Sequence, residues 1–316
     1  MIEPKAAGRP QPAAAAVRWS AGVNRPRCAL PQPATDCHHH LYDDRLAVAP
    51  GAFLQPPEAT VEDYRALQRR LGLARNVLIQ PSTYGTDNRG LVVGLERFGP
   101  AYARGIAVVD RHAGEDVLRR LNDAGVCGLR INAIARPADG DHANVVALGR
   151  RCADLGWHLE INASADWIAA AAALLRGLPC PVVFDHLGHL PQPRGNGHPA
   201  FSIMRGLLDA GRGWIKLTGL YNDSRRGPPR YEDSAAVAAA FAAFAPERAV
   251  WGSDWPHPTE PAHAKPNDAD LLDLLLEWVP DDAALRRILV TNPALLYGFP
   301  LPPENDAFGA GNLPER

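Results

Sequence analysis

Eight short apolar runs alternate with longer amphipathic segments along this chain, and this alternation limits its possible folds more than any other feature. The runs are rich in β-branched residues, as buried parallel strands are. We predict strands at 34–40, 76–80, 105–109, 128–132, 158–162, 182–186, 214–218 and 249–254. Helices are predicted at 61–71, 89–98, 115–124, 144–155, 167–176, 200–211, 234–244 and 269–278. Eight strands, each followed by a helix, predict a closed (β/α)8 barrel.

The domain organisation follows from where this alternation begins and ends. One barrel of the usual size accounts for residues 34–300, so we predict a single domain. Residues 1–33 and 301–316 lack hydrophobic periodicity and are predicted to be tails, the first of them disordered or extended. Thr60 and the pair Asp233-Ser234 are predicted helix N-caps. A doubly wound open sheet is the alternative fold, which is disfavoured because no Gly-rich phosphate loop follows any strand.

Charge and cysteine content exclude several classes of function. The formal net charge is −2 at pH 7, and Lys and Arg are scattered, so we expect no nucleic-acid partner. The longest apolar run near the amino terminus, residues 13–17, is too short for a signal peptide or a membrane span, so no membrane partner is expected. Five cysteines form no CxxC pair, which favours free thiols and a cytoplasmic location. Monomer and homo-oligomer both remain open.

Ligand-capable side chains stand at the predicted ends of three strands, where barrels of this kind carry their chemistry. Alternation along the first strand places His38 and His40 on one face and residues 37 and 39 on the other. His186 ends the sixth predicted strand, and Asp254 ends the eighth. A lone histidine here would more simply be a hydrogen-bonded core residue. Three imidazoles and a carboxylate at matching strand ends instead predict a metal-binding or water-activating site.

Other strand ends are polar enough to bind a substrate. An arginine in the barrel mouth is costly to bury alone, so Arg130 should meet either a protein carboxylate or an anionic substrate, and we favour the substrate. Arg225 and Arg226, after the seventh strand, are explained equally well as substrate contacts or as solvated surface charges. The predicted substrate-binding residues are Ser82, Tyr84, Asn88, Arg130, Asn132, Asn162, Tyr221 and His257.

Five motifs stand in order along the chain: DCHHH at 36–40, QPSTYGTDN at 80–88, FDHLG at 184–188, WGSDWPHP at 251–258 and NPALLYGF at 292–299. This set resembles the amidohydrolase-2 branch of the amidohydrolase superfamily. It is most similar to the lactonase group of that branch, which includes pyrone-dicarboxylate lactonases, a sulfomuconolactone hydrolase and a sugar-lactone isomerase. The resemblance spans residues 34–300 and implies a distorted (β/α)8 barrel. It also implies that His38, His40, His186 and Asp254 occupy the family's metal-binding or water-activating positions.

The same resemblance sets an expectation for the cofactor. The family's bridging Lys or Glu and its fifth-strand histidine do not stand in their usual places, because His158 begins that strand and Asn162 ends it. We therefore expect at most one divalent metal ion, zinc or manganese, held by the four residues just named. A metal-free site is the alternative, since the pyrone lactonases work without a required metal.

The expected reaction is hydrolysis of a small anionic lactone that carries a carboxylate, of dicarboxylate or sugar-acid type, in aromatic or sugar-acid catabolism. Asp254 would deprotonate water, and Arg130 would hold the substrate carboxylate. The histidines, or a metal bound by them, would stabilise the oxyanion. Asn162 and the loop around Tyr221 differ from the pyrone lactonases, so a different substrate is expected. The alternatives are lactone isomerisation, metal-dependent decarboxylation and a catalytically inactive binding barrel.

Overall fold

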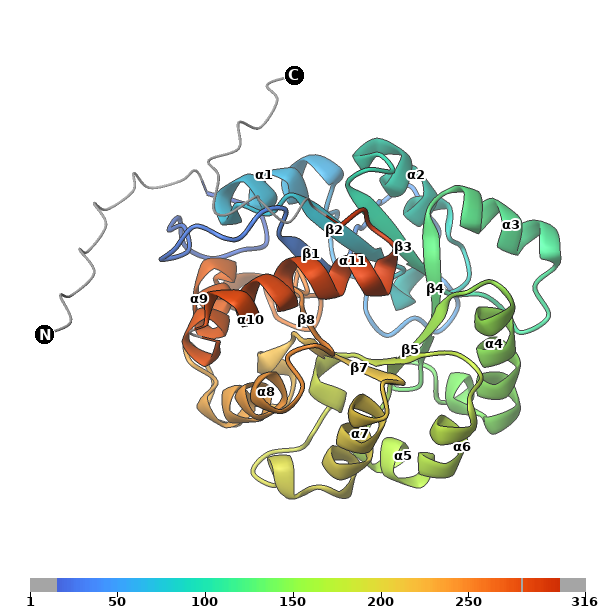
Figure 1. Cartoon of the computed structure of the whole chain (residues 1–316). Helices are drawn as coiled ribbons and strands as arrows, with labels where there is room; N and C mark the ends of the chain where they lie inside the picture. Colours follow the sequence, from blue (N-terminus) through green and yellow to red (C-terminus); the bar gives the residue numbers. More distant parts are fainter. Residues whose placement is uncertain (1–15, 280, 302–316) are drawn as a thin grey trace, which may run out of the picture.

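Eight parallel strands form one sheet in the order β1 to β8, and helices surround it (Figure 1). The computed structural model describes residues 16–279 and 281–301. The sheet closes on itself, because Asp254 N donates to His38 O at 2.7 Å and His40 N donates to Trp255 O at 2.8 Å. The predicted (β/α)8 barrel is therefore confirmed. The strands are β1 (Thr35–His39), β2 (Arg75–Ile79), β3 (Ala103–Ala107), β4 (Val126–Asn132), β5 (His158–Asn162), β6 (Val182–Phe184), β7 (Gly213–Leu217) and β8 (Ala249–Trp251).

The helices follow the strands in sequence, and local signals set several of their ends. Thr60 begins α1 with a reciprocal capping box to Asp63, and Gly72 ends it in the left-handed region, at φ 79°. The helices are α1 (Val61–Leu71), α2 (Arg89–Phe98), α3 (Glu115–Asp123), α4 (His142–Asp154), α5 (Ala165–Ala170), α6 (Ala172–Gly177), α7 (Pro199–Asp209), α8 (Glu232–Phe244), α9 (Asp268–Trp278), α10 (Asp282–Arg286) and α11 (Asn292–Tyr297).

Two local predictions about helices were wrong. The helix predicted at 167–176 is divided into α5 and α6 at Ala171, a position that no Gly or Pro marks. The predicted caps Asp233 and Ser234 lie inside the first turn of α8, which begins after Tyr231 without a side-chain cap. The Asp233 carboxylate instead accepts hydrogen bonds from Ser224 Oγ and Arg225 N, so it braces the preceding loop.

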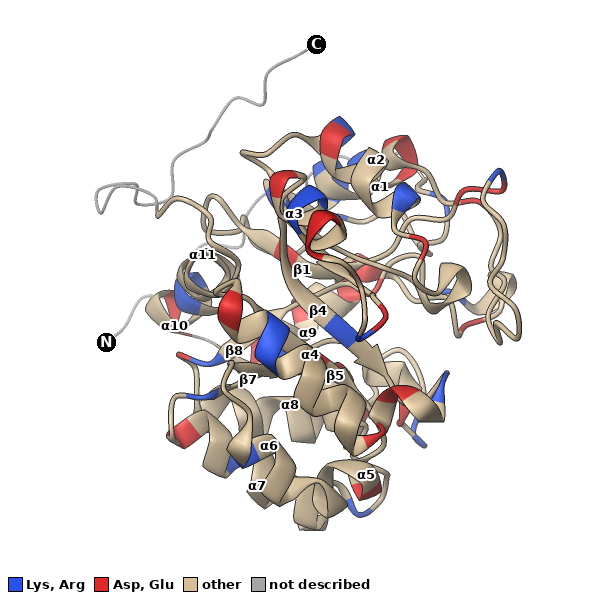
Figure 2. Cartoon of the chain, turned by 90° about the vertical axis from the view of Figure 1, so that its right-hand side faces the viewer, with Lys and Arg blue, Asp and Glu red and all other residues tan. Residues whose placement is uncertain are grey.

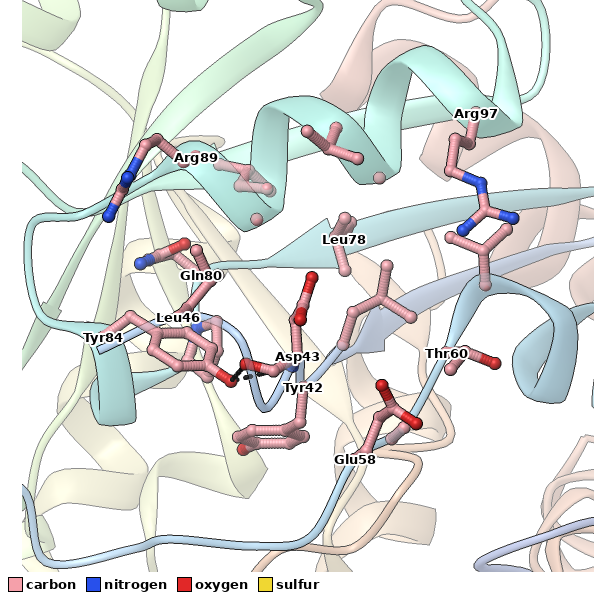
Figure 3. A pocket seen from close by; sticks show the side chains of 18 of the residues that line it. Tyr42, Asp43, Leu46, Glu58, Thr60, Leu78, Gln80, Tyr84, Arg89 and Arg97 are labelled. Atoms are coloured by element: carbon pink, nitrogen blue, oxygen red, sulfur yellow. Dashed lines mark hydrogen bonds between the residues drawn. The ribbon is translucent and has the colours of Figure 1, made fainter. Parts of the chain in front are cut away.

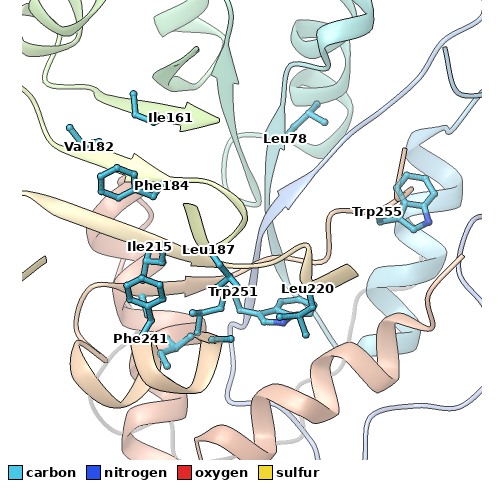
Figure 4. Packing of buried hydrophobic residues seen from close by; sticks show 14 of the residues in the cluster. Leu78, Ile161, Val182, Phe184, Leu187, Ile215, Leu220, Phe241, Trp251 and Trp255 are labelled. Atoms are coloured by element: carbon cyan, nitrogen blue, oxygen red, sulfur yellow. The ribbon is translucent and has the colours of Figure 1, made fainter. Parts of the chain in front are cut away.

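Two apolar layers hold the barrel together. Outward-facing strand residues pack against the helices, as Figure 4 shows for Phe184, Ile215 and Phe241. Inside the barrel, a smaller apolar cluster includes Tyr297 and Phe299 from the C-terminal segment. In Figure 1, α10 and α11 cross in front of the strands at this end of the barrel. This apolar cluster closes one end of the barrel, and the polar side chains gather at the other end, where the carboxyl ends of the strands lie.

The predicted N-terminal tail is described from residue 16, and residues 16–33 pack against the barrel. Arg18 O accepts a hydrogen bond from Trp255 Nε1 at 2.9 Å, and Gly22 O accepts one from Arg70 at 2.9 Å. Residues 1–15 and, within the predicted C-terminal tail, residues 302–316 lie outside the described residues.

Charged residues of both signs are scattered over the surface of the barrel (Figure 2). Exposed pairs such as Arg120 and Asp116, with Nη1 and Oδ2 3.0 Å apart, lie along single helices. None of the helices within residues 16–279 and 281–301 has the length and apolar character needed to cross a membrane.

Candidate active site

His38 and His40 approach the mouth of the barrel from β1. The pairing of β1 with β2 shifts register within the strand, which breaks strict alternation. As a result, Cys37 packs with the apolar residues inside the barrel, whereas His39 stacks on Tyr64 of α1 with ring centroids 3.6 Å apart. The prediction that residues 37 and 39 share one face is therefore wrong.

His186 and Asp254 lie just beyond β6 and β8, outside the strands predicted to contain them: His186 begins a short 3-10 helix (His186–Gly188), and Asp254 lies in the loop after β8. Their φ angles are 47° and 61°, in the left-handed region that non-glycine residues rarely adopt. Such backbone strain persists where surrounding contacts hold it, and it clusters at functional sites. Gly252 lets β8 come close to β1, because a Cβ atom at that position would lie 2.6 Å from Cβ of His38. The turn after β8 thereby brings Asp254 beside β1.

Asp254 is the point at which the three histidines meet. Its Oδ1 atom lies 3.4 Å from His40 Nε2 and 3.6 Å from His38 Nε2. Its Oδ2 atom lies 3.9 Å from His186 Nδ1 and accepts a hydrogen bond from the Tyr221 hydroxyl at 2.6 Å. The structure thus brings together the four residues that the sequence predicted to form the catalytic centre.

Burial and neighbouring groups set the protonation of this cluster. Burial, together with the Lys216 ammonium, holds the pKa of His38 well below its usual range, and burial lowers the pKa of His186 to about 4. Burial opposes ionisation of Asp254, but interactions with His186, His40 and His38 outweigh it and hold the pKa of Asp254 below its usual range. At neutral pH the site therefore contains an ionised carboxylate beside the neutral imidazoles of His38 and His186.

The chemistry of these side chains fits one divalent metal ion. His38, His40 and Asp254 each offer a ligand atom within 4.8 Å of the others, as do His38, Asp185 and His186. Neutral imidazoles and a carboxylate are ligands that zinc and manganese accept. Within the described part of the chain, His38 Nε2 and His186 Nδ1 are buried without a hydrogen-bond partner. The two sets share His38, and Asp185 is already paired with two cations, so the first set is the better site for a single ion.

A buried ionic network that the sequence analysis missed supports His38 from inside the barrel. Lys216 Nζ lies 2.7 Å from Glu160 Oε2, 3.2 Å from Asp185 Oδ1 and 3.1 Å from His38 Nδ1. Burial disfavours the Lys216 charge, but Asp185 and Glu160 outweigh it and raise the pKa of Lys216 above its usual value. The ammonium donates to His38 Nδ1, so the proton of the neutral ring lies on Nε2, facing Asp254. One signal in the sequence could have predicted this network: Lys216 and Glu160 each place a charge in the middle of a predicted strand.

Arg130 meets a protein carboxylate and also borders the cavity. Its Nε atom donates to Asp185 Oδ2 at 2.8 Å, which realises one of the two predicted alternatives. The side chain, 4% exposed, lines both the main cavity and a second cavity of about 440 Å³ that Arg111 and Arg136 also line. No described residue accepts a hydrogen bond from its two terminal nitrogens. These nitrogens are therefore available to an anionic ligand.

The main cavity opens at the carboxyl ends of the strands and has a volume of about 370 Å³, which suits a ligand with one ring. Asn162 joins two of its walls, because its Nδ2 atom donates to Asn132 Oδ1 at 2.9 Å and its Oδ1 atom lies 2.8 Å from His189 Nε2. The predicted substrate-binding residues that line the cavity are Ser82, Arg130, Asn132 and Asn162. Lining residues that the sequence analysis did not single out include Phe53, Leu54, Ile134, His189 and Thr259.

Tyr84 and Asn88 lie outside this cavity, so the prediction that they bind substrate is not supported by their position. The Tyr84 hydroxyl bonds the backbone N and O of Asp43 at 2.8 and 3.1 Å, in a separate pocket beside α2 (Figure 3). The Asn88 side chain bonds the backbone of Val108 at 2.8 and 3.1 Å. Both side chains stabilise loops through these hydrogen bonds. A polar residue after a strand can serve either role, so its position in the sequence did not separate loop stabilisation from ligand binding.

Tyr221 and His257 are likewise absent from the cavity lining and lie behind Asp254. Tyr221 is 8% exposed and His257 is fully buried. Both side chains make contacts within the protein, while Asn222, Pro258 and Thr259 from the same two turns line the cavity.

Sequence comparison relates the chain to enzymes of one family. A family model described as Amidohydrolase matches residues 35–299. The chain is 36% identical over 279 residues to the 4-sulfomuconolactone hydrolase of Rhizobium radiobacter, with 85% of this chain and 91% of that protein covered. It is 32% identical over 275 residues to the D-galactarolactone isomerase of Agrobacterium fabrum, with 86% and 93% covered. The 2-pyrone-4,6-dicarboxylate hydrolase of Comamonas testosteroni is 31% identical, with 88% and 94% covered.

Solved structures give the same result. An apo crystal structure of an Agrobacterium tumefaciens protein superposes with a TM-score of 0.80 at 31% identity, covering 87% of this chain and 99% of that chain. A probable 2-pyrone-4,6-dicarboxylic acid hydrolase from Acinetobacter baumannii, with citric acid bound, superposes with a TM-score of 0.73 at 26% identity, covering 85% and 100%. The family match spans the whole barrel and all four clustered residues. The chain therefore belongs to the amidohydrolase family, in its amidohydrolase-2 branch.

Proposed function

We propose that this protein is a hydrolase that opens a carboxylate-bearing lactone by attack of water on the ring carbonyl. The observation that carries the proposal is that ionised Asp254 and the guanidinium of Arg130 line one cavity. The carboxylate can activate water, and the guanidinium can bind an anionic group. Relatives that are 31% to 36% identical are named as hydrolases or an isomerase of lactones and pyrones, which supports the reaction class.

The geometry supplies a role for each group in the hydrolysis. Asp254 Oδ1 accepts a proton from water while the water oxygen attacks the carbonyl carbon. The imidazoles of His40 and His186, which line the cavity, stabilise the oxyanion, and Lys216 fixes the ring of His38 beside Asp254. The C–O bond of the ring then breaks, and the proton on Asp254 passes to the leaving oxygen, which restores the carboxylate. His38, His40 and Asp254 would hold a divalent ion, which would supply a Lewis acid for the carbonyl and the water.

The walls of the cavity support a small anionic substrate. Arg130 is buried, so its terminal nitrogens act at low dielectric and favour a carboxylate strongly. Phe53 and Ile134, which are 84% and 49% exposed, are apolar side chains that line the same cavity from two loops. A ring with an apolar face and a carboxylate edge matches these walls. The citric acid bound to the Acinetobacter relative is also a carboxylic acid.

Lactone isomerisation is the second candidate, and the 32% identity to a D-galactarolactone isomerase favours it. The same Asp254 would then deprotonate a hydroxyl group of the substrate, which would attack the carbonyl in place of water. The two reactions share every protein group and differ only in the nucleophile.

Product mass in ¹⁸O-labelled water separates the two reactions. The purified full-length chain is incubated with pyrone-dicarboxylate, muconolactone-type and sugar-acid lactones, with uncharged lactones of the same ring size as controls. We expect a carboxylated lactone to gain one labelled water, and its uncharged counterpart to react much more slowly. A product of unchanged mass would support isomerisation, and no reaction with any carboxylated lactone would contradict the proposal.

A further inference from the structure

Three buried side chains, Tyr221, His257 and Asp268, form a hydrogen-bonded series that begins at Asp254. The Tyr221 hydroxyl lies 2.6 Å from Asp254 Oδ2 and 3.0 Å from His257 Nδ1. His257 Nε2 lies 3.2 Å from Asp268 Oδ2, at the start of α9. Tyr221 is 8% exposed, and His257 and Asp268 are fully buried. Tyr221 and His257 do not line the cavity, so their contacts act on Asp254 rather than on a ligand.

The direction of the hydrogen bonds to the two carboxylates follows from the protons available. A hydroxyl carries one proton, and an ionised carboxylate can only accept. Tyr221 therefore donates to Asp254, and its oxygen faces His257 Nδ1. The Asp268 carboxylate accepts from His257 Nε2 in turn. Arg70 of α1, 4.0 Å from the same Asp268 oxygen, places a cation beside that carboxylate.

The hydrogen bond from Tyr221 gives the two carboxylate oxygens of Asp254 different surroundings. Oδ2 is occupied by Tyr221, whereas Oδ1 lies toward His40, a residue that lines the cavity. The backbone adds an independent constraint, because Asp254 and His257 both have left-handed φ angles, 61° and 55°, and His257 N donates to Asp254 O at 2.7 Å. The turn and the side-chain contacts thus hold the same carboxylate from two sides.

We propose that Tyr221, His257 and Asp268 form a positioning chain that fixes the Asp254 carboxylate, so that Oδ1 is the oxygen that activates the nucleophile. The inference rests on the proposed function only for the reaction that Asp254 serves. A freely rotating carboxylate would spend part of its time with neither oxygen aligned, and the loss would appear in kcat because the chain does not touch the substrate.

Tyr221→Phe removes the donor to Asp254 and keeps the ring. We expect kcat to fall roughly 10- to 100-fold, as for loss of a hydrogen bond to a charged group, with KM changed less than about twofold. Tyr231→Phe is the matched control, since Tyr231 is 5% exposed, lies 6.3 Å from Tyr221 between ring centroids and has no hydroxyl partner among the described residues. If Tyr221→Phe lowered kcat no more than Tyr231→Phe does, the proposal would be overturned.

A pair of variants at His257 tests the middle of the chain. The side-chain amide of His257→Asn can take the place of Nδ1 beside the Tyr221 hydroxyl, whereas that of His257→Gln takes the place of Nε2 beside Asp268. We expect the Asn variant to retain several-fold more of kcat than the Gln variant, at equal KM. Equal activity of the two would mean that His257 acts only as a packed side chain.

A crystal structure of Tyr221→Phe without substrate distinguishes failure of this inference from failure of the proposed function. We expect the Asp254 carboxylate to rotate from its wild-type orientation or to occupy two orientations, and to keep the wild-type orientation in Tyr231→Phe. A carboxylate that keeps its single wild-type orientation in Tyr221→Phe would overturn the positioning chain whatever the substrate. If no lactone is opened but the carboxylate turns in Tyr221→Phe, the proposed function fails and the positioning chain stands.

Discussion

The ammonium nitrogen of Lys216 lies 3.1 Å from Nδ1 of His38, inside the barrel and out of contact with solvent. Two buried cations, Arg130 and Lys216, face two buried carboxylates, Asp185 and Glu160, at distances of 2.7 to 3.2 Å. The network therefore carries no net charge while His38 is neutral. It fixes the ring orientation and tautomer of His38 before any ligand arrives.

Removing Lys216 should destabilise the fold, because one buried carboxylate would lose its counter-charge. We expect Lys216→Met to lower the free energy of unfolding by about 3–5 kcal/mol. The double variant Lys216→Met/Glu160→Gln restores a neutral network and should lose less than the single variant. Urea denaturation followed by circular dichroism measures both. Additive losses in the double variant would show that charge balance does not set the stability of this network.

Replacing Arg130 tests recognition of the substrate anion. Arg130→Lys keeps a positive charge beside Asp185 but loses the planar fork that binds a carboxylate through two nitrogens. We expect KM for a carboxylated lactone to rise roughly 10- to 100-fold, with a smaller change for an uncharged lactone. Steady-state kinetics on both lactones provide the measurement. Arg120→Lys is the control, since Arg120 is 70% exposed and pairs with Asp116 on one helix. An equal rise in KM for both lactones would place the substrate carboxylate elsewhere.

Metal content is predicted to reach at most one equivalent per chain. The two possible ligand sets share His38, and Asp185 is already held by Lys216 and Arg130. A metal on His38 Nε2 requires the ring proton to move to Nδ1, where Asp185 Oδ1, 3.5 Å away, can accept it. Elemental analysis of purified protein and calorimetric zinc titration check the stoichiometry. Two tightly held ions would contradict this description of the site.

Local sequence signals predicted most of the fold. The bounds of α1 and α2 agree with prediction, because Thr60 caps the first and hydrophobic periodicity defines both. The division at Ala171 could not be predicted, since it falls inside a run of alanines with high helix propensity. The register shift in β1 depends on pairing with β2, which is tertiary information.

The sequence also predicted which residues form the catalytic cluster, but not the buried residues that support it. His38, His40, His186 and Asp254 meet because parallel strands carry their ends to one rim of the barrel. Lys216 was missed because it lies in the middle of a strand, below the rim. The partners of Tyr84 and Asn88 are backbone atoms of loops, and loop conformation follows no periodicity in the sequence.

Replacing Asp254 by asparagine tests whether this carboxylate activates the nucleophile for lactone opening. The variant keeps the size of the side chain and removes the base, and Asp209→Asn, at an exposed helix end, serves as the control. On the lactone that the wild-type protein opens, we predict that kcat falls roughly 10²- to 10⁴-fold while the substrate still binds. Turnover by Asp254→Asn at the rate of the wild-type protein would show that Asp254 is not the base.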